Sequence, residues 1–245
     1  MSKYFFESEQ LRNGKITLQG DTAHHLLHVL RIAVGDEIIL CNGANVDYYT
    51  VVTELPKSKL PTVKLEMRVA TRSRTESHTE VTLYQSLPKG DKLDTIIQKC
   101  VELGVFEIVP VETERSVVRI KDAQKKSSRY QRIAESAAGQ SMRGIIPTVR
   151  TAVSFAEAVA ELDTNALTLV AHEQEKTRIL KEAIMPRRRP ETINLWIGPE
   201  GGFTPEEIAA LQEAQAVTVS LGTRTLRTET AAIAMLAQVM YEVEG

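Results

Sequence analysis

Apolar and polar residues alternate with a period of two in several short runs within the first part of the chain. The runs at 15–18, 37–41, 46–53 and 63–70 predict β-strands, separated by turn sequences such as Asn13-Gly14 and Asn42-Gly43. Residues 22–31 have helical spacing instead. Several short strands so close together predict a small β-barrel, and the polar run 71–79 predicts a linker after it.

From residue 80 onward the pattern changes to near-continuous apolar runs that alternate with amphipathic segments. The apolar runs predict strands at 81–87, 105–111, 166–172, 192–197 and 217–221. The segments between and after them predict helices at 91–103, 125–140, 154–162, 176–184, 205–214 and 229–243. Such alternation is typical of an α/β fold with a mostly parallel sheet covered on both faces. We therefore expect two domains, at 1–74 and 75–245.

Composition narrows the class of protein. The chain has 245 residues, 42% of them hydrophobic, and its 30 basic against 32 acidic side chains give a net charge of −2. It contains no apolar run of about 18 residues, so no membrane span is predicted. We also see no signal peptide, and the two cysteines are too few for a disulfide framework. A cytoplasmic, reduced protein is the expectation. Residues 115–150 carry nine basic and two acidic side chains, which fits a polyanionic partner or simply a solvated helix face.

Several common catalytic motifs are absent from the sequence. We find no P-loop, no G-x-G-x-x-G after a strand, no H-E-x-x-H and no G-x-S-x-G. Cys100 shares a helical stripe with Leu93 and Ile96, which favours a buried, inert thiol over a nucleophile. His24 and His28 stand four residues apart, but no third ligand lies nearby, so no metal site is expected.

Residues 195–207 form the first motif that points to chemistry, Leu-Trp-Ile-Gly-Pro-Glu-Gly-Gly-Phe-Thr-Pro-Glu-Glu. A predicted strand ends at Ile197 and a glycine-rich turn follows. Thr204 is a predicted helix N-cap, with Pro205 at the first helical position and Glu207 completing a capping box. A simple strand-to-helix turn needs only one glycine. Three glycines and an acidic side chain at the carboxyl end of a strand therefore favour a ligand site.

Residues 220–232 form the second motif, Ser-Leu-Gly-Thr-Arg-Thr-Leu-Arg-Thr-Glu-Thr-Ala-Ala, which also follows a predicted strand. Arg224 and Arg227 lie in a short loop before an apolar helix. Two arginines beside a glycine turn can hold an anion or a nucleobase carbonyl. A mere helix-entry loop with Thr228 as its N-cap would need neither arginine.

Together these motifs resemble the RsmE family of bacterial small-subunit ribosomal RNA methyltransferases, which act on uridine N3. The similarity extends over nearly the whole chain, and supporting segments include 89–94, 97–104, 114–118 and 28–31. The resemblance implies a SPOUT-type parallel sheet tied in a trefoil knot, preceded by a PUA-like β-barrel. It also implies S-adenosylmethionine as cofactor, 16S ribosomal RNA within the small subunit as partner, and a homodimer.

The resemblance further implies which residues form the site. Three loops would hold the cofactor, with the residues Leu169, His172, Gly198, Pro199, Glu200, Gly201, Leu221, Gly222 and Leu226. A second set would contact RNA: Arg31, Lys89, Arg115, Arg119, Lys125, Lys126, Arg129, Arg143 and Arg224.

The chemistry of the expected reaction suggests two catalytic residues. Uracil N3 must lose its proton to become nucleophilic, and the negative charge then spreads over O2 and O4. A cation near those oxygens lowers the barrier, and Arg227 is the first candidate, with Arg143 as an RNA-side partner. Glu200 is a candidate proton acceptor, or only orients the cofactor. Three alternatives stay open: another RNA target, a different anionic ligand such as a nucleotide, and a non-catalytic ribosome-assembly factor.

Overall fold

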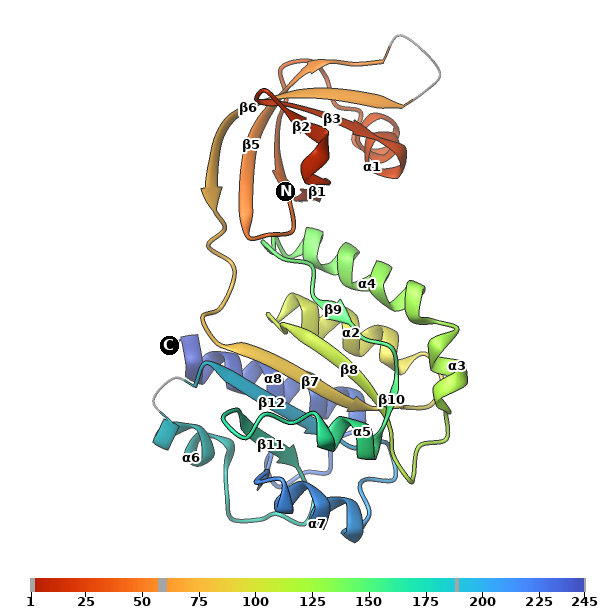
Figure 1. Cartoon of the computed structure of the whole chain (residues 1–245), viewed down its shortest axis with the longest axis vertical. Coiled ribbons are helices and arrows are strands. Elements are labelled where there is room, and N and C mark those ends of the chain that lie inside the picture. Colours follow the sequence, from red (N-terminus) through yellow and green to blue (C-terminus); the bar gives the residue numbers. More distant parts are fainter. Residues whose placement is uncertain (1–2, 57–60, 188–189, 245) are drawn as a thin grey trace. The chain divides into compact units, whose positions relative to one another are not determined.

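The computed structural model of the chain describes residues 3–56, 61–187 and 190–244 (Figure 1). It divides into two compact units. Unit 1 contains Met1–Glu76 and Ala138–Ile146, and unit 2 contains Ser77–Ala137 and Pro147–Gly245. The predicted domain boundary between residues 74 and 75 lies close to the first break, which follows Glu76. The return of residues 138–146 to unit 1 is not predicted from the sequence.

Unit 1 is built on a six-stranded sheet in the order β1-β4-β5-β6-β3-β2. The parallel pair β1–β4 lies at one edge, and the other neighbours are antiparallel. The described pairings form an open path from β1 to β2. The strands are β1 (Tyr4–Phe5), β2 (Leu11–Arg12), β3 (Lys15–Gln19), β4 (Glu37–Cys41), β5 (Val46–Glu54) and β6 (Thr62–Arg72). The four predicted strands are confirmed, and β6 extends into the predicted linker.

The predicted helix at 22–31 is confirmed in part. The chain begins an α-helix, α1 (Gly20–His24), and then widens into a π-helical turn, η2 (His25–Val29). The helix ends at Val29, two residues earlier than predicted, and Arg31 then has a φ of 55°. A short 3-10 helix, η1 (Ser8–Gln10), precedes β2. Leu26 is buried and packs against the apolar face of the sheet, and together they form a small hydrophobic core.

Residues 138–146 join unit 1 through hydrogen bonds and one buried ion pair. The carbonyl of Gly139 accepts the amide of Lys3 at 3.0 Å, and that of Gly144 accepts the amide of Asn45 at 2.9 Å. Arg143 pairs with Glu76 at 2.6 Å, and the side chain of Arg143 is only 3% exposed. Unit 1 therefore depends on a segment that is distant from it in sequence.

Unit 2 holds a seven-stranded sheet in which all described pairings are parallel (Figure 1). The prediction of a mostly parallel sheet is confirmed, and the five predicted strands are among the seven. The main path is β10-β8-β7-β12-β11-β13, and β9 pairs with β8. The strands are β7 (Glu80–Ser86), β8 (Glu107–Glu112), β9 (Thr148–Val149), β10 (Val153–Ser154), β11 (Leu167–Ala171), β12 (Thr192–Ile197) and β13 (Val217–Val219). The two-residue strands β9 and β10 are too short to show a pattern, and the sequence does not predict them.

Helices cover both faces of this sheet (Figure 1). On one face Trp196 packs with Tyr84, Ala158, Ile208 and Leu211, whereas α2 and α8 pack together on the other. The helices of unit 2 are α2 (Lys92–Glu102), α3 (Ile120–Gln124), α4 (Ser127–Gln140, whose end enters unit 1), α5 (Phe155–Ala160), α6 (Leu180–Ile184), the 3-10 helix η3 (Met185–Arg187), α7 (Pro205–Glu213) and α8 (Thr228–Glu244).

Two predictions about the helices have clear outcomes. Cys100 is fully buried in α2, and burial raises the pKa of its thiol, so the prediction of an inert cysteine is confirmed. The predicted helix at 176–184 is wrong in its first turn, because α6 begins only at Leu180. The backbone before it is extended and pairs with the end of β13, where the amide of Ser220 donates to the carbonyl of Arg178 at 2.8 Å.

Within the described residues, every helix is too short or too polar to span a membrane. The same part of the chain holds no group of three or more side chains suited to bind a metal ion.

Candidate functional site

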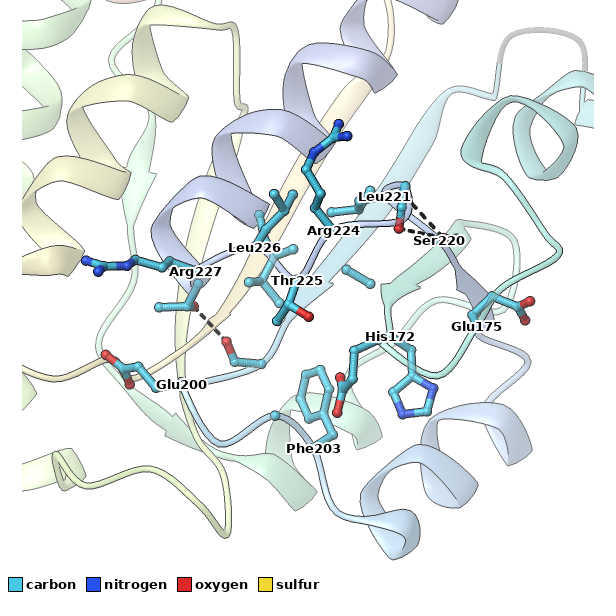
Figure 2. A pocket seen from close by; sticks show the side chains of 18 of the residues that line it. His172, Glu175, Glu200, Phe203, Ser220, Leu221, Arg224, Thr225, Leu226 and Arg227 are labelled. Carbon is cyan, nitrogen blue, oxygen red and sulfur yellow. Dashed lines mark hydrogen bonds between the residues drawn. The ribbon is translucent and has the colours of Figure 1, made fainter.

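Three loops of unit 2 line one cavity of about 470 Å³. They follow β11, β12 and β13, which are neighbours in the sheet because β11 pairs with both of the others. The carboxyl ends of parallel strands meet at the same edge, so loops far apart in sequence come together there. Figure 2 shows His172, Glu200, Leu221 and Leu226 around this space.

The loop after β12, Gly198–Phe203, is shaped by its own sequence. The amide of Gly202 donates to the carbonyl of Pro199 at 3.0 Å, and Gly202 has a φ of +67°, which favours glycine. A capping box between Thr204 and Glu207 then starts α7 with Pro205 in its first turn, as predicted.

Residues after β8 brace this glycine loop from outside. One guanidinium nitrogen of Arg115 donates to the carbonyls of Gly201 at 2.7 Å and Phe203 at 3.2 Å. The amide of Glu114 donates to the carboxylate of Glu207 at 2.8 Å. Arg115 therefore supports the loop, whereas the sequence predicts only a contact to RNA for it.

A buried hydrogen-bond relay holds the first residue of the loop. The hydroxyl of Thr228 donates to the carbonyl of Gly198 at 2.7 Å, and it accepts a hydrogen bond from the Gln85 side chain at 3.0 Å. Gln85 is fully buried at the end of β7, and Thr228 is 5% exposed. The relay ties the loop after β12 to β7 and to the first turn of α8. Gln85 is not predicted from the sequence, since nothing near a polar residue in a strand indicates which distant group it will bond.

The loop after β11 contributes two carboxylates with different environments. Glu175 accepts the amides of Arg178 and Thr177 and the hydroxyls of Thr177 and Thr218, which lower its pKa to about 2. Glu173 instead faces the glycine loop: a Cβ atom added to Gly202 would stand 3.0 Å from its Oε1. Glu175 thus shapes the loop, whereas Glu173 is a carboxylate on the cavity wall.

The glutamate of the glycine loop is held by α2. Lys92 donates to Glu200 Oε1 at 2.7 Å, and the amide of Lys89 donates to the same oxygen at 3.2 Å. Burial alone would raise the pKa of Glu200, but Lys92 and the backbone amides outweigh it and lower the pKa. The carboxylate is therefore ionised at neutral pH.

The two arginines of the second motif both line the cavity. Figure 2 shows Arg227 and Glu200 extending to the same side, while Arg224 extends to a different side. Both arginines are exposed. Within the described residues, neither guanidinium has an acidic partner, so both are available to an anion.

All but one of the predicted cofactor-contacting residues line this cavity. These are His172, Gly198, Pro199, Glu200, Gly201, Leu221, Gly222 and Leu226. The exception is Leu169, which is fully buried inside β11. The prediction for Leu169 is corrected: the residue belongs to the core beneath the site, because it lies two residues before the strand's end.

Most of the predicted RNA-contacting side chains of residues 115–150 are paired with acids. Arg119 pairs with Glu112, Lys125 with Asp122, Lys126 with Asp91, and Arg129 with Asp94. Arg143 is buried against Glu76, which overturns its predicted role as a surface contact to RNA. The remaining predicted side chains, Arg31, Lys89, Arg115 and Arg224, are exposed and have no acidic partner among the described residues. Of these, Arg115 already donates to the carbonyls of the glycine loop.

Comparison with known proteins decides the family. Residues 75–240 match a model described as an RNA methyltransferase domain, and residues 18–65 match an RNA methyltransferase PUA domain. The ribosomal RNA small subunit methyltransferase E of Bacillus subtilis is 34% identical over 100% of this chain and 98% of its own length. The chain belongs to the RsmE family.

Solved structures of RsmE-like proteins agree with this assignment. The ribosomal RNA small subunit methyltransferase E of Neisseria gonorrhoeae, bound to S-adenosylmethionine, is 32% identical with a TM-score of 0.87, covering 98% of this chain and 97% of that one. A methyltransferase of Legionella pneumophila, in complex with S-adenosylmethionine, is 30% identical with a TM-score of 0.84, covering 97% and 96%. The α/β architecture and the PUA-like N-terminal domain are therefore confirmed for this RsmE member.

Proposed function

We propose that this RsmE member transfers a methyl group from S-adenosylmethionine to N3 of a uridine in 16S ribosomal RNA. The uridine is U1498, the position associated with the RsmE family. The observation that carries the proposal is the single cavity formed by three loops at the ends of neighbouring strands. On its wall lie an ionised glutamate and two arginines that have no acidic partner in the part of the chain that the structure describes.

The residues of the cavity fit the cofactor. Its volume of about 470 Å³ falls within the usual range for small-molecule sites. Leu221, Leu226 and Phe203 offer apolar surface for a purine, and the glycine loop lets a ligand approach the backbone. The carboxylates of Glu173 and Glu200 suit a ligand that carries positive charge.

The methyl sulfonium, when bound, supplies an electrophile strong enough that the protein has chiefly to orient the reactants. The chain's own residues must then favour loss of the uracil N3 proton. We propose that Arg227 lies near uracil O2 or O4 and stabilises the negative charge that develops there. Its guanidinium has no acidic partner among the described residues, so it keeps its charge available.

Glu200 has the ionisation state that a proton acceptor needs. Lys92 and the Lys89 amide both donate to Oε1, which leaves Oε2 outside these two bonds. The lowered pKa makes the carboxylate a weak base, so we propose that its main role is to orient the cofactor. It takes up the N3 proton, directly or through water, only as Arg227 stabilises the uracil anion.

The remaining parts of the proposal concern partners. We propose that Lys89 and Arg224 in unit 2, and Arg31 in unit 1, contact RNA phosphates. Arg119, Lys125, Lys126 and Arg129 join them by exchanging their acidic partners for phosphate, since ion pairs of such exposed cations are weak. We also propose a homodimer, a trefoil knot in the loops around the cavity, and a cytoplasmic location alongside the small ribosomal subunit.

The test combines binding and transfer. Calorimetry would measure the affinity for S-adenosylmethionine, and labelled methyl incorporation would be measured into small subunits from a strain that lacks this gene, with large subunits and naked 16S RNA alongside. We expect saturable binding and incorporation into small subunits. If the protein binds S-adenosylmethionine but methylates only another RNA, the proposed target is wrong. If it neither binds S-adenosylmethionine nor methylates any of these RNAs, a non-catalytic assembly factor is favoured.

A further inference from the structure

Lys92 stands between two carboxylates at the edge of the cavity. Its ammonium lies 2.7 Å from Glu200 Oε1 and 3.5 Å from Glu229 Oε2. The three side chains are partly buried, with 31%, 27% and 21% of their surface exposed respectively. Glu200 belongs to the loop after β12, and Glu229 belongs to the first turn of α8. One lysine of α2 thus joins two segments that begin in different parts of the sequence.

The position of Lys92 in its helix is unfavourable for a cation. It is the first residue of α2, after Asp91 at the N-cap. The helix dipole favours negative charge at this end and disfavours an ammonium. A residue that breaks a local preference is expected where function or a tertiary contact compensates, and here Glu200 and Glu229 provide that compensation.

The two carboxylates need Lys92 as much as it needs them. Glu229 Oε2 is buried and makes no hydrogen bond among the described residues, so the ammonium at 3.5 Å is its compensating group. Glu200 accepts the Lys92 ammonium on Oε1. Without the cation, two negative charges at this edge would repel each other.

We propose that Lys92 is a positioning residue of the methyl-transfer site, which clamps the glycine loop to the first turn of α8 by holding Glu200 and Glu229 at once. The clamp determines where the Glu200 carboxylate stands on the cavity wall. It also joins the loop that carries Glu200 to α8, the helix that begins directly after Arg227. Glu200 and Arg227 are the two candidate catalytic residues. The proposal deepens the proposed function and rests on it for the meaning of the site, but the contact itself is testable without any reaction.

The amide of Lys89 provides a direct reporter. It donates to Glu200 Oε1 at 3.2 Å, so its NMR resonance in the full-length protein titrates with this carboxylate. In the wild type we expect a midpoint below the ordinary glutamate pKa of 4.5. Lys92→Gln should raise the midpoint by about 0.5–1 pH unit, because an opposite charge is lost, and Lys92→Arg should restore it.

Two further variants keep the test sharp. In Glu229→Gln, Lys92 pairs with Glu200 only, and a nearby negative charge is lost. The midpoint of the Lys89 amide titration should therefore move down, in the opposite direction to Lys92→Gln. Lys99→Gln is the matched control, because Lys99 is on the same helix but pairs with Glu102 away from the cavity. It should leave the midpoint unchanged.

The functional readout is the affinity for S-adenosylmethionine. We expect Lys92→Gln to weaken it by about two- to fivefold, with recovery in Lys92→Arg and no change in Lys99→Gln. An unmoved Lys89 midpoint, or equal effects of Lys92→Gln and Lys99→Gln, would overturn the clamp. Failure of every protein, including the wild type, to bind S-adenosylmethionine would instead overturn the proposed function, with the NMR result still standing.

Discussion

The hydroxyl of Thr228 donates a 2.7 Å hydrogen bond to the carbonyl of Gly198, and this bond joins the start of α8 to the start of the glycine loop. The same oxygen accepts a hydrogen bond from buried Gln85 at 3.0 Å. Thr228, which the sequence predicts as an ordinary helix N-cap, therefore fixes the glycine loop after β12. Two elements of the site take their relative position from one side chain.

Thr228→Val keeps the shape of the side chain and removes the hydroxyl. Half-buried Gly198 and fully buried Gln85 then each lose a hydrogen-bond partner, so we expect the free energy of unfolding to fall by about 1–3 kcal/mol. S-adenosylmethionine affinity should fall with it, whereas Thr228→Ser should retain both. Denaturant titration and calorimetry provide the measurements. Equal stability of the Val variant and the wild type would argue against the relay.

Gly202→Ala tests the shape of the glycine loop. The φ of +67° disfavours any side chain, and the new Cβ would stand 3.0 Å from Glu173 Oε1. We expect a loss of about 1–2 kcal/mol in unfolding free energy together with weaker S-adenosylmethionine binding.

Gly14→Ala is the matched control for this substitution. Gly14 has a similar φ of +75°, with no heavy atom within 4 Å of an added Cβ, and it lies in unit 1. It should lose comparable stability and keep its affinity for S-adenosylmethionine. A parallel loss of affinity in both variants would show that general destabilisation, and not the loop, explains the effect.

Arg227→Ala tests the proposed electrostatic stabilisation. Loss of one cation at the developing charge should lower kcat about 10²-fold. S-adenosylmethionine affinity should change less than about threefold, because the interaction strengthens only in the transition state. Arg227→Lys should recover part of the rate. Single-turnover kinetics with small subunits provide the measurement, and a fully active Ala variant would remove Arg227 from the mechanism.

The pair Glu76–Arg143 predicts a pH dependence of stability. Burial alone would raise the pKa of Glu76, but the Arg143 guanidinium and the Gly144 amide outweigh it and lower the pKa below 4.5. The pair therefore stabilises the protein above this pH, and the stability is lost as pH falls through the lowered pKa.

Glu76→Gln should cost about 3–5 kcal/mol at pH 7, because Arg143 would remain buried without its countercharge. Its stability should also depend less on pH below 4.5 than that of the wild type. Thermal melts between pH 3 and pH 7 measure both effects. If the two proteins lose stability in parallel on acidification, another carboxylate is responsible.

Local sequence signals predict the elements of the site well. The Thr204–Glu207 capping box forms as expected, and the strand ending at Ile197 leads into the glycine loop where the sequence places it. These features depend on residues a few positions apart. The loops after β11, β12 and β13 meet as the resemblance to the RsmE family implies, at the edge where the parallel strands have their carboxyl ends.

Long-range pairings could not be predicted in this way. The basic residues Lys126 and Arg129 meet acids on and before α2, each 35 positions away, so a run that looks strongly cationic in sequence is partly neutralised. Arg143 is buried because the chain carries residues 138–146 back to unit 1. Lys92 likewise looks like a surface lysine until the fold brings Glu200 and Glu229 to it.

The most direct test of the account is the identity and position of the methylated base. Small subunits from a strain without this gene would be incubated with the protein and S-adenosylmethionine, digested with nuclease and mapped by mass spectrometry, with Arg227→Ala in parallel. The account predicts 3-methyluridine at a single site of 16S ribosomal RNA, strongly reduced with the variant. Methylation of another atom or another base, or no methylation by a protein that binds S-adenosylmethionine, would contradict it.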